Sequence, residues 1–383
     1  MKRKLLKSLV AVGLVGSMVL AGCGGSGDSD ASSSASSGSS AASSASSADS
    51  ESADSSSSSS AASSSASSEA PAGDAEFAEV EAPAGKTLRS LPVAQAPEET
   101  IRIASVCVQN NPWGSAVMVG QEFAKEVLAD YNCEVDVLGV PSFDAMEWTS
   151  TLENCIASGY DAICFMAISD ELQPATEQAI DAGIDVFLFN CDLPDTERIS
   201  FYGMDDIQAG NVAGNAIAEL MPDGGKYAII TGDFTVTGHE NRRKGCHEIT
   251  DAQSNLECVG EYENNDAADQ AYSLTTDILN ANPDVQAIYV TAGGPAGAAQ
   301  ALVDAGRDDV MLICHDVLDS VADYIKDGTI DICIDQDPFN QGYQPIVDAY
   351  NYLVAGITPE ENNTYDAIVA TPDNVEELFP ELF

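Results

Sequence analysis

Amide, carboxylate, guanidinium and aromatic side chains follow several short apolar runs of this chain. These positions are Asn111, Trp113, Asn190, Asp192, Arg242, Asp316 and Gln336. Asp, Asn and Arg can each bridge two neighbouring hydroxyl groups, and hydrogen bonds with a charged partner are the strong ones. A flat ring such as Trp113 can lie against the C–H face of a sugar. No nucleophile is paired with a base in this set, so these residues predict that a neutral polyhydroxyl ligand is bound and released unchanged.

The elements that must position these side chains are short β-rich runs alternating with amphipathic segments from Glu98 onward. In the first amphipathic segment, Val117, Ala124 and Leu128 recur at helical spacing. The pattern predicts strands at 101–108, 134–140, 162–166, 185–189, 199–202, 226–230, 257–261, 287–290, 310–314, 330–335 and 367–370. It predicts helices near 114–130, 144–158, 171–182, 206–221, 239–252, 267–281, 295–305, 317–327 and 339–355. Such alternation is typical of parallel sheets covered on both faces, whose ligands bind outside the carboxyl ends of the strands.

The number of strands favours two sheets over one. Eleven predicted strands are many for one open sheet, and about 285 residues is near the size at which a single core splits. We therefore expect an α/β protein with two doubly wound, Rossmann-like lobes built on parallel sheets.

The charge balance excludes several classes of partner. The chain has 383 residues, with 15 Lys and Arg against 62 Asp and Glu, and a formal net charge of −47. Binding to nucleic acid requires a basic face, and so does attachment to an anionic membrane by charge alone. Neither is expected. The 44% of hydrophobic residues is enough for a core, and the strong negative charge favours a soluble monomer.

The N-terminal residues have the pattern of an export signal. Four basic residues, Lys2, Arg3, Lys4 and Lys7, precede an apolar run over residues 9–20. The run ends in Leu-Ala-Gly-Cys at Cys23, which resembles a bacterial lipobox and implies cleavage behind Gly22 and a lipid on Cys23. The alternative is an ordinary secretory signal followed by a chance cysteine. We expect a signal peptide over residues 1–22 and an extracytoplasmic protein anchored to the membrane by its lipid.

A long polar segment separates this anchor from the predicted strands. Residues 24–69 are almost all Ser and Ala, which cannot bury enough apolar surface to offset the loss of chain entropy. We predict that residues 23–97 form the lipidated Cys23 and a disordered tether.

The segment from about residue 101 to Phe383 resembles the type 1 periplasmic-type substrate-binding proteins of bacterial sugar ABC transporters, in their ribose-binding and rhizopine-like branch. The matching runs are QNNPWG, IASGYDAI, DAGIDVFLFNCDLPD, GMDDIQAGNVAG, ENRRKG, ILNANPDVQAIYV and IDQDPFNQGY. The resemblance implies a sugar-binding domain over 98–383, with two lobes joined by three crossings and the ligand in the cleft. It implies an N-lobe of about 101–205 and 337–365, and a C-lobe of about 206–336 and 366–383.

The resemblance also assigns individual residues. The Asn-Pro-aromatic motif of the family maps to Asn111 and Trp113. Asn190 stands where the family often has Asp, with Asp192 two residues on. The remaining matches are Arg242 of the R-x-x-G run, Asp316 of the F-D-x motif, in which His315 replaces Phe, and the late Gln336.

Three departures from the family pattern remove side-chain donors. Met166-Ala167, Cys191 and Ala292-Gly293 stand where polar residues are common. They suggest a ligand with an apolar edge, such as a deoxy or methylated sugar. Backbone N–H groups at Gly293-Gly294 would be the alternative source of donors, at a helix start.

Each assignment has a structural alternative. Trp113 could pack inside its lobe, Arg242 could form a surface ion pair of little energetic weight, and Asp316 could cap the helix that follows it. Trp148 lies in the middle of a predicted helix and is expected to pack.

The sequence predicts neither a metal nor a cofactor. His239 and His247 are eight residues apart with no H-E-x-x-H motif, and the Gly-rich run at 293–297 lacks the G-x-G-x-x-G spacing. Nine cysteines remain besides Cys23, an odd number without a C-x-x-C pair, so a complete set of disulfides is not expected.

These observations favour a receptor that is not an enzyme. It would close its cleft on a monosaccharide or related polyol and deliver it to an ABC permease. One alternative is a sugar sensor that docks on a signalling partner. Another is a secreted hydrolase, in which Asp192 and Asp316 would have to form the carboxylate pair.

Overall fold

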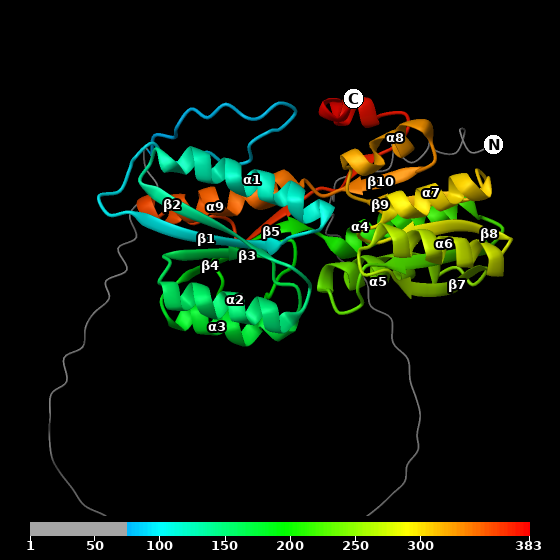
Figure 1. Cartoon of the computed structure of the whole chain (residues 1–383), viewed down its shortest axis with the longest axis horizontal. Coiled ribbons are helices and arrows are strands. Elements are labelled where there is room, and N and C mark those ends of the chain that lie inside the picture. Colours follow the sequence, from blue (N-terminus) through cyan, green and yellow to red (C-terminus); the bar gives the residue numbers. More distant parts are fainter. Residues whose placement is uncertain (1–74) are drawn as a thin grey trace, which may run out of the picture. The chain divides into compact units, whose positions relative to one another are not determined.

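The computed structural model describes residues 75–383, which form two α/β lobes with one six-stranded sheet each (Figure 1). The predicted signal peptide, the lipidated Cys23 and the tether up to residue 74 lie outside the described residues. Within residues 75–383, every helix is too short or too polar to span a bilayer.

The N-lobe contains a sheet with the strand order β11-β5-β4-β3-β1-β2, in which all pairs are parallel. Its strands are β1 (Ile101–Val108), β2 (Cys133–Val140), β3 (Ala162–Phe165), β4 (Asp185–Phe189), β5 (Ser200–Met204) and β11 (Asn362–Tyr365). Its helices are α1 (Pro112–Ala129), α2 (Ala145–Ser158), α3 (Gln173–Asp181), which follows the 3₁₀ turn η3 (Asp170–Leu172), and α9 (Pro338–Ala355). Helices α1 and α9 cover one face of this sheet, and α2 and α3 cover the other (Figure 1).

The C-lobe contains a sheet with the order β12-β10-β9-β8-β6-β7, parallel except for the antiparallel pair β10–β12. Its strands are β6 (Gly225–Thr231), β7 (Leu256–Glu263), β8 (Val285–Val290), β9 (Met311–His315), β10 (Ile332–Asp335) and β12 (Ile368–Ala370). Its helices are α4 (Asp206–Leu220), α5 (Thr237–Thr250), α6 (Ala268–Ala281), α7 (Pro295–Ala305), α8 (Asp319–Asp327), α10 (Val375–Leu378) and the 3₁₀ turn η4 (Pro380–Leu382).

The chain passes between the two sheets three times, after β5, after β10 and between β11 and β12. The predicted fold class, two doubly wound lobes with parallel sheets and three crossings, is confirmed. Strand β11 was not predicted.

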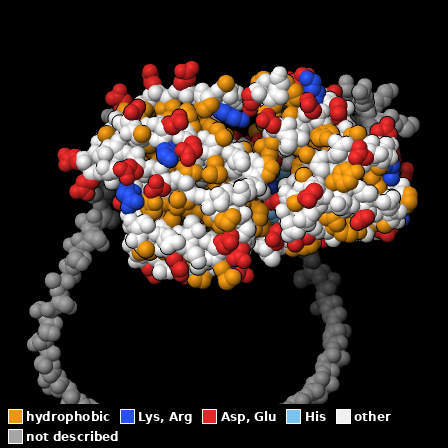
Figure 2. Space-filling model, viewed as in Figure 1, with side chains coloured by type: hydrophobic (Ala, Val, Ile, Leu, Met, Phe, Trp, Pro, Cys, Tyr) orange, Lys and Arg blue, Asp and Glu red, His pale blue; other side chains and the backbone are white. Residues whose placement is uncertain are grey.

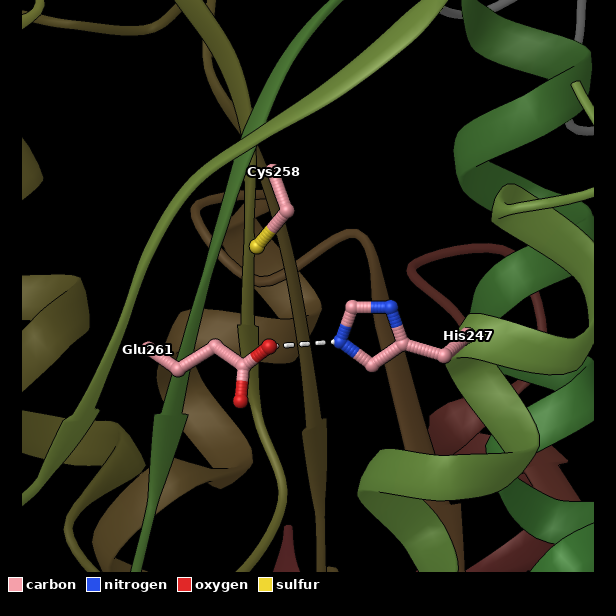
Figure 3. A group of neighbouring side chains, drawn as sticks. All are labelled: His247, Cys258 and Glu261. Atoms are coloured by element: carbon pink, nitrogen blue, oxygen red, sulfur yellow. Dashed lines mark hydrogen bonds and ion pairs between the residues drawn. The ribbon is translucent and has the colours of Figure 1, made fainter. Parts of the chain in front are cut away.

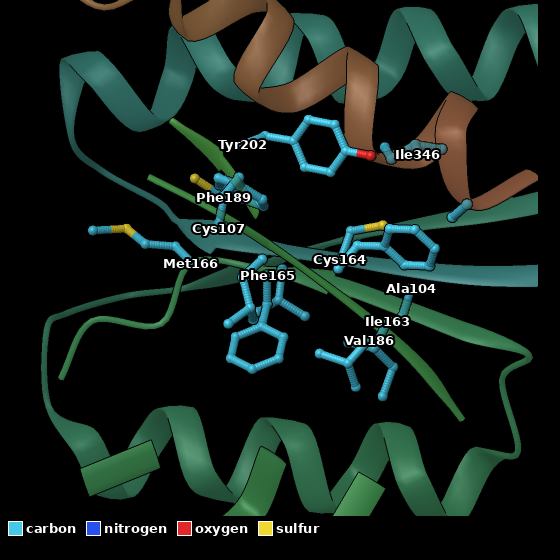
Figure 4. Close-up of a cluster of buried hydrophobic side chains, with 14 of the residues drawn as sticks. Ala104, Cys107, Ile163, Cys164, Phe165, Met166, Val186, Phe189, Tyr202 and Ile346 are labelled. Atoms are coloured by element: carbon cyan, nitrogen blue, oxygen red, sulfur yellow. The ribbon is translucent and has the colours of Figure 1, made fainter. Parts of the chain in front are cut away.

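The N-lobe core shows why its central strands are rich in apolar residues. All four residues of β3 are buried, because helices cover both faces of the sheet. In Figure 4, Phe165 points toward the helices below the sheet, whereas Tyr202 points toward α9 above it. Trp148 is fully buried in the same cluster and its Nε1 donates to the Ser142 carbonyl at 2.8 Å, so its predicted packing role is confirmed.

Residues 75–97, which we call the strap, correct the prediction that the tether extends to residue 97. Val93 is buried and its N–H donates to Asn351 Oδ1 at 2.8 Å. The Asn351 amide donates to the Leu91 carbonyl at 3.0 Å, and the Asn340 amide donates to the Thr87 carbonyl at 2.8 Å. The strap was misassigned because side chains of α9 satisfy its backbone, and this pairing leaves no pattern in the strap's own sequence.

The strap also contacts the segments that connect the two lobes. Arg89 forms an ion pair with Asp337 at 2.7 Å and lies over the Tyr365 ring at 4.2 Å. Lys86 forms an ion pair with Glu381, in the tail of the C-lobe, at 2.8 Å. The strap therefore contacts the N-lobe, two of the crossings and the C-lobe tail.

Packing of the strap predicts a stability effect. Val93→Ala should lower the free energy of unfolding by about 1–3 kcal/mol, because two buried methyl groups are lost and a cavity remains. Val119→Ala, at an exposed position of α1, is the matched control and should change it by less than about 0.5 kcal/mol. Chemical denaturation measures both, and equal effects would show that the strap does not pack on the N-lobe.

Candidate ligand-binding site

A small cavity of about 20 Å³ lies between the lobes, beyond the carboxyl ends of the strands. Its lining residues are Asn111, Trp113, Phe143, Met166, Asn190, His239, Arg242, Asp266, Ala292, Gly293, Asp316 and Gln336. Six of the seven predicted contact residues are therefore brought together, and Asp192 is not among them.

Local sequence rules place Asn111 and Trp113 at the cavity. Asn111 is the N-cap of α1, where its Oδ1 accepts from the N–H groups of Trp113 at 2.9 Å and Gly114 at 3.2 Å. Pro112 takes the first helical position, which needs no N–H donor. A Cβ on Gly114 would come within 2.1 Å of the Val108 carbonyl oxygen, so only glycine lets α1 begin this close to β1.

The side chains of three polar residues reach the cavity from a left-handed backbone. Asn190, Asp266 and Asp316 have φ of 63°, 56° and 68°. Asn and Asp tolerate this conformation better than other residues with a Cβ. The turns after β4, β7 and β9 therefore favour the residue types that can also hydrogen-bond a ligand.

Arg242 is buried rather than part of a surface ion pair. Its Nε donates to Asp206 Oδ1 at 2.7 Å, and its Nη1 donates to the Thr291 carbonyl at 3.1 Å. Close packing of α5 on α4 makes this reach possible: a Cβ on Gly245 would lie 2.1 Å from the Ile207 carbonyl oxygen. The glycine of the R-x-x-G run thus lets the helix that carries the arginine approach the carboxylate on α4.

Gln336 joins the polar groups of both lobes. Its Nε2 donates to Asp316 Oδ1 at 2.7 Å. Its Oε1 accepts from Asn190 Nδ2 at 2.9 Å and from Arg242 Nη2 at 3.0 Å. Asp316 is not a helix cap, because α8 begins at Asp319 with Leu318 at the cap position.

The two remaining predicted residues differ in their surroundings. Asp192 accepts from Arg198, whose Nη2 lies 2.7 Å from its Oδ2, and it does not line the cavity. Trp113 lines the cavity while also packing in the N-lobe core. Its buried Nε1 has no hydrogen-bond partner within residues 75–383.

Sequence reasoning missed Asp266, His239 and Phe143. Asp266 links the lobes, since its Oδ2 accepts from Asn111 Nδ2 at 2.9 Å. Its Oδ1 accepts from the Gly293 N–H at 2.8 Å, so that N–H is already paired and is not a free donor. Asp266 was missed because β7 was expected to end at residue 261, whereas it runs to Glu263. The polar run at 264–266 that follows the strand was the available signal.

Direct contacts hold the lobes together around the cavity. The Thr237 N–H donates to the Ile168 carbonyl at 3.1 Å, and the Phe143 ring meets the His239 ring edge-on at 5.8 Å. A wider cavity of about 650 Å³ adjoins the small one, with Asn111, Phe143 and Asp266 in both linings. The small cavity has room for about one water molecule, which is less than a sugar ring needs.

Burial determines the protonation behaviour of the site. It raises the pKa of Asp316 to about 6, partly opposed by Arg242. It also raises the pKa of Asp206 and lowers the pKa of His239. Burial alone would lower the pKa of Arg242, but the carboxylates of Asp206 and Asp316 outweigh it and raise that pKa. One cation thus faces several carboxyl groups, which suits a ligand that donates hydroxyl hydrogen bonds and disfavours an anion.

Acidic side chains are spread over both lobes in the view of Figure 2, with few basic ones among them. The surface, like the cavity, therefore carries more acidic than basic groups, and its electric field does not attract an anionic ligand.

Comparison with known proteins places the chain among binding proteins. Residues 104–357 match the family described as periplasmic binding protein domain. The D-apiose import binding protein of Actinobacillus succinogenes is 29% identical over 214 residues, which is 55% of this chain and 69% of that protein. The D-ribose/D-allose-binding protein of Pseudomonas aeruginosa is 29% identical over 230 residues, or 58% of this chain and 71% of that protein.

The fold has close counterparts among solved structures. The glucose-galactose binding protein GanP of Geobacillus stearothermophilus superposes with a TM-score of 0.65 and 24% identity. The match covers 72% of this chain and 99% of that one, so the shared architecture spans the whole of the solved protein.

A buried carboxyl below the site predicts a pH effect. Asp335 accepts from the N–H groups of Val317 at 3.1 Å and Asp337 at 2.8 Å, and burial raises its pKa to about 7. Between its unfolded pKa of about 3.9 and that value, the folded state binds more protons than the unfolded state. Stability should therefore fall as pH rises from about 4 to about 7, by up to about 1.4 kcal/mol per pH unit from this group.

Asp335→Asn tests this effect, because it should flatten the dependence of the unfolding free energy on pH over that range. Asp323→Asn, at an exposed position of α8, is the control and should keep the slope of the parent protein. A parent whose stability does not change between pH 4 and 7 would contradict the assignment.

Proposed function

The chain belongs to the family of periplasmic binding protein domains, and from that premise we propose that it captures a monosaccharide or related polyol outside the cytoplasmic membrane and delivers it to an ABC permease. The observation that carries the proposal is the network around Gln336, which joins Asn190 of one lobe to Arg242 and Asp316 of the other. The lobes are about 101–205 with 337–365 and about 206–336 with 366–383.

The protein is a binding protein and not an enzyme, as are the named members of its family. The hydrolase alternative required Asp192 and Asp316 to act as a pair. Asp316 lines the cavity, whereas the carboxylate of Asp192 is held by Arg198 outside it. The import proteins among its relatives favour delivery to a permease over transfer to a signalling partner.

Ligand capture follows from opening and closing of the lobes. A sugar ring does not fit in the cavity of about 20 Å³, so the lobes must separate before it enters. Hydroxyl groups of the ligand then take over donors and acceptors that pair across the cleft, such as Asn111 with Asp266. The ligand favours closure only to the extent that it interacts better with the closed state.

The apolar residues of the cavity narrow the ligand class. Met166 and Ala292 line the cavity, and neither side chain can form a hydrogen bond with a ligand hydroxyl. Cys191 is buried nearby, and its thiol donates to Asn190 Oδ1 at 3.3 Å. We therefore assign a sugar with an apolar edge, such as a deoxy or methylated sugar.

Membrane attachment completes the proposal. The lipid on Cys23 anchors a monomer, residues 1–22 are removed as the signal peptide, and the tether spans from Cys23 to the strap. The strap follows the tether and contacts the crossing after β10 through the ion pair of Arg89 with Asp337.

Two substitutions test the site once a calorimetric screen of monosaccharides and polyols has found the best ligand. Trp113→Ala removes the stacking surface. Arg242→Lys keeps a charge beside Asp206 but loses the planar fork that reaches Thr291 and Gln336. Each should weaken binding at least tenfold, or about 1.4 kcal/mol.

Arg102→Lys, at the start of β1 and outside the cavity lining, is the matched control and should bind like the parent. If both site variants also bind like the parent while folded, the site is assigned to the wrong residues.

The same screen tests the ligand class separately. Deoxy or methylated sugars should bind at least tenfold more tightly than fully hydroxylated pentoses. An extra hydroxyl would lose its hydration beside Met166 and Ala292, whose side chains cannot form a hydrogen bond in return. Tight and exclusive binding of a fully hydroxylated pentose would reject the deoxy-sugar assignment while leaving the sugar-binding function in place.

A further inference from the structure

Three side chains of different chemistry converge at the outer edge of the C-lobe, away from the cleft residues. His247 comes from α5, and Cys258 and Glu261 come from β7 (Figure 3). One donor atom from each, a ring nitrogen, a sulfur and a carboxylate oxygen, lies within 4.8 Å of the other two. None of the three lines the cavity of the proposed function.

An irregularity in β7 brings Cys258 and Glu261 to the same side. In a regular strand, residues three apart point to opposite faces. Here Cys258 pairs with Tyr227 and Glu261 pairs with Ile229, so two residues of β7 stand opposite one residue of β6. The extra residue, as in a β-bulge, turns Glu261 to the face of Cys258; in Figure 3 the Glu261 carboxylate points toward His247 and the Cys258 sulfur lies beside this pair.

The groups around the cluster orient its donors. The Nδ1 of His247 lies 3.1 Å from Asp251 Oδ1, and its Nε2 lies 2.7 Å from Glu261 Oε1. Arg243 Nη1 holds the other oxygen of Glu261 at 2.7 Å. A histidine that ligates a metal through one nitrogen commonly donates its other N–H to a carboxylate, and ligating carboxylates are themselves hydrogen-bonded.

His247 contacts one carboxylate on each side of its ring. A neutral imidazole has a single N–H, so it can donate to Asp251 or to Glu261 but not to both. The separation of 2.7 Å between Nε2 and Glu261 Oε1 is that of a hydrogen bond, so the two atoms must move apart by a few tenths of an ångström to bind one metal ion.

The local charge also fits a divalent ion. The neighbouring charged side chains are the carboxylates Glu240, Asp251 and Glu261 and the cations Arg243 and Lys244. They sum to 2 − 3 = −1 with Cys258 protonated and −2 with its thiolate. A divalent cation on the thiolate form brings the cluster to zero.

Cys258 differs from the other cysteines of residues 75–383. Eight of the nine free cysteines in that range are buried, whereas Cys258 is half-buried. Its thiol makes a long contact of 3.5 Å with the Gly260 carbonyl. Burial raises the pKa of this thiol, so a metal ion must displace its proton, but its half-buried position leaves the sulfur within reach of an ion from solvent.

We propose that His247 Nε2, Cys258 Sγ and Glu261 Oε1 bind one borderline-soft divalent transition metal of the zinc class, with solvent at the fourth position. Nitrogen, sulfur and oxygen donors together favour Zn²⁺ and its first-row neighbours over Mg²⁺ or Ca²⁺. The ion clips the C-terminal half of α5 to the edge strand β7. This departs from the prediction of no metal, because the histidines were paired with each other in the sequence instead of with β7.

Cobalt is the probe that tests the proposal. The whole protein, without a polyhistidine tag, is titrated with Co²⁺. The expected result is a thiolate-to-cobalt charge-transfer absorption that saturates at one equivalent and is abolished by Zn²⁺. Cys258→Ser should remove this absorption, and His247→Gln should weaken Co²⁺ binding at least tenfold. Glu257→Gln, an exposed position of the same strand, is the control and should leave both unchanged.

Two results would overturn the proposal. One is the absence of a saturable charge-transfer absorption in the parent protein. The other is an absorption that persists at parental strength in Cys258→Ser and His247→Gln, which would place the metal elsewhere. Circular dichroism of each variant establishes that it is folded, and His247→Gln provides the test if Cys258→Ser does not fold.

Discussion

Burial of the Arg242 guanidinium imposes the strongest constraint on the C-lobe side of the cleft. A buried cation is costly unless a carboxylate and further acceptors surround it. Asp206 supplies the carboxylate at 2.7 Å, and the Thr291 carbonyl and Gln336 supply the acceptors. This arrangement exists only because Gly210 and Gly245 let α4 and α5 approach closely. The position of the arginine is therefore a consequence of helix packing, and its charge then fixes the orientation of Gln336.

Gln336 transfers this constraint to the hinge, because it is the residue that follows β10 at the second crossing. On the cleft side it joins Asn190 to Arg242. Its neighbour Asp337 is held on the opposite side by Arg89 of the strap. Two consecutive residues thus connect the cleft and the N-terminal strap. A change in the angle between the lobes must therefore alter the contacts of both Gln336 and Asp337.

The sequence predicted those parts of the protein whose signal is local. Strand β1 was predicted at its observed bounds because six of its eight residues are apolar and most of the strand is buried. The cleft residues were found because parallel strands gather their carboxyl ends at one edge. Strand β11 was missed, since its sequence NNTY has a single buried residue, Tyr365, and it pairs only with β5 among residues 75–383. The strap was missed because its backbone partners, Asn340 and Asn351, lie about 250 residues further along the chain.

Helix α5 brings the remaining observations together, because neighbouring residues on it face two different groups. Arg242 points to Asp206 and the cavity, whereas Arg243 binds Glu261 at the outer edge of the sheet. His247, one turn further on, meets the same Glu261. The sequence indicated the role of Arg242 because the R-x-x-G spacing is local. It did not indicate the contact of His247 with Glu261, because that contact depends on the extra residue of β7 opposite Ala228. A metal at that face would hold the helix at its C-terminal half and leave the N-terminal half, with His239 and Arg242, to meet the ligand. The C-terminal half of α5 would then be held in place, while residues of its N-terminal half contact the ligand. Sites carried by rigid helices or strands are positioned more precisely than sites on loops.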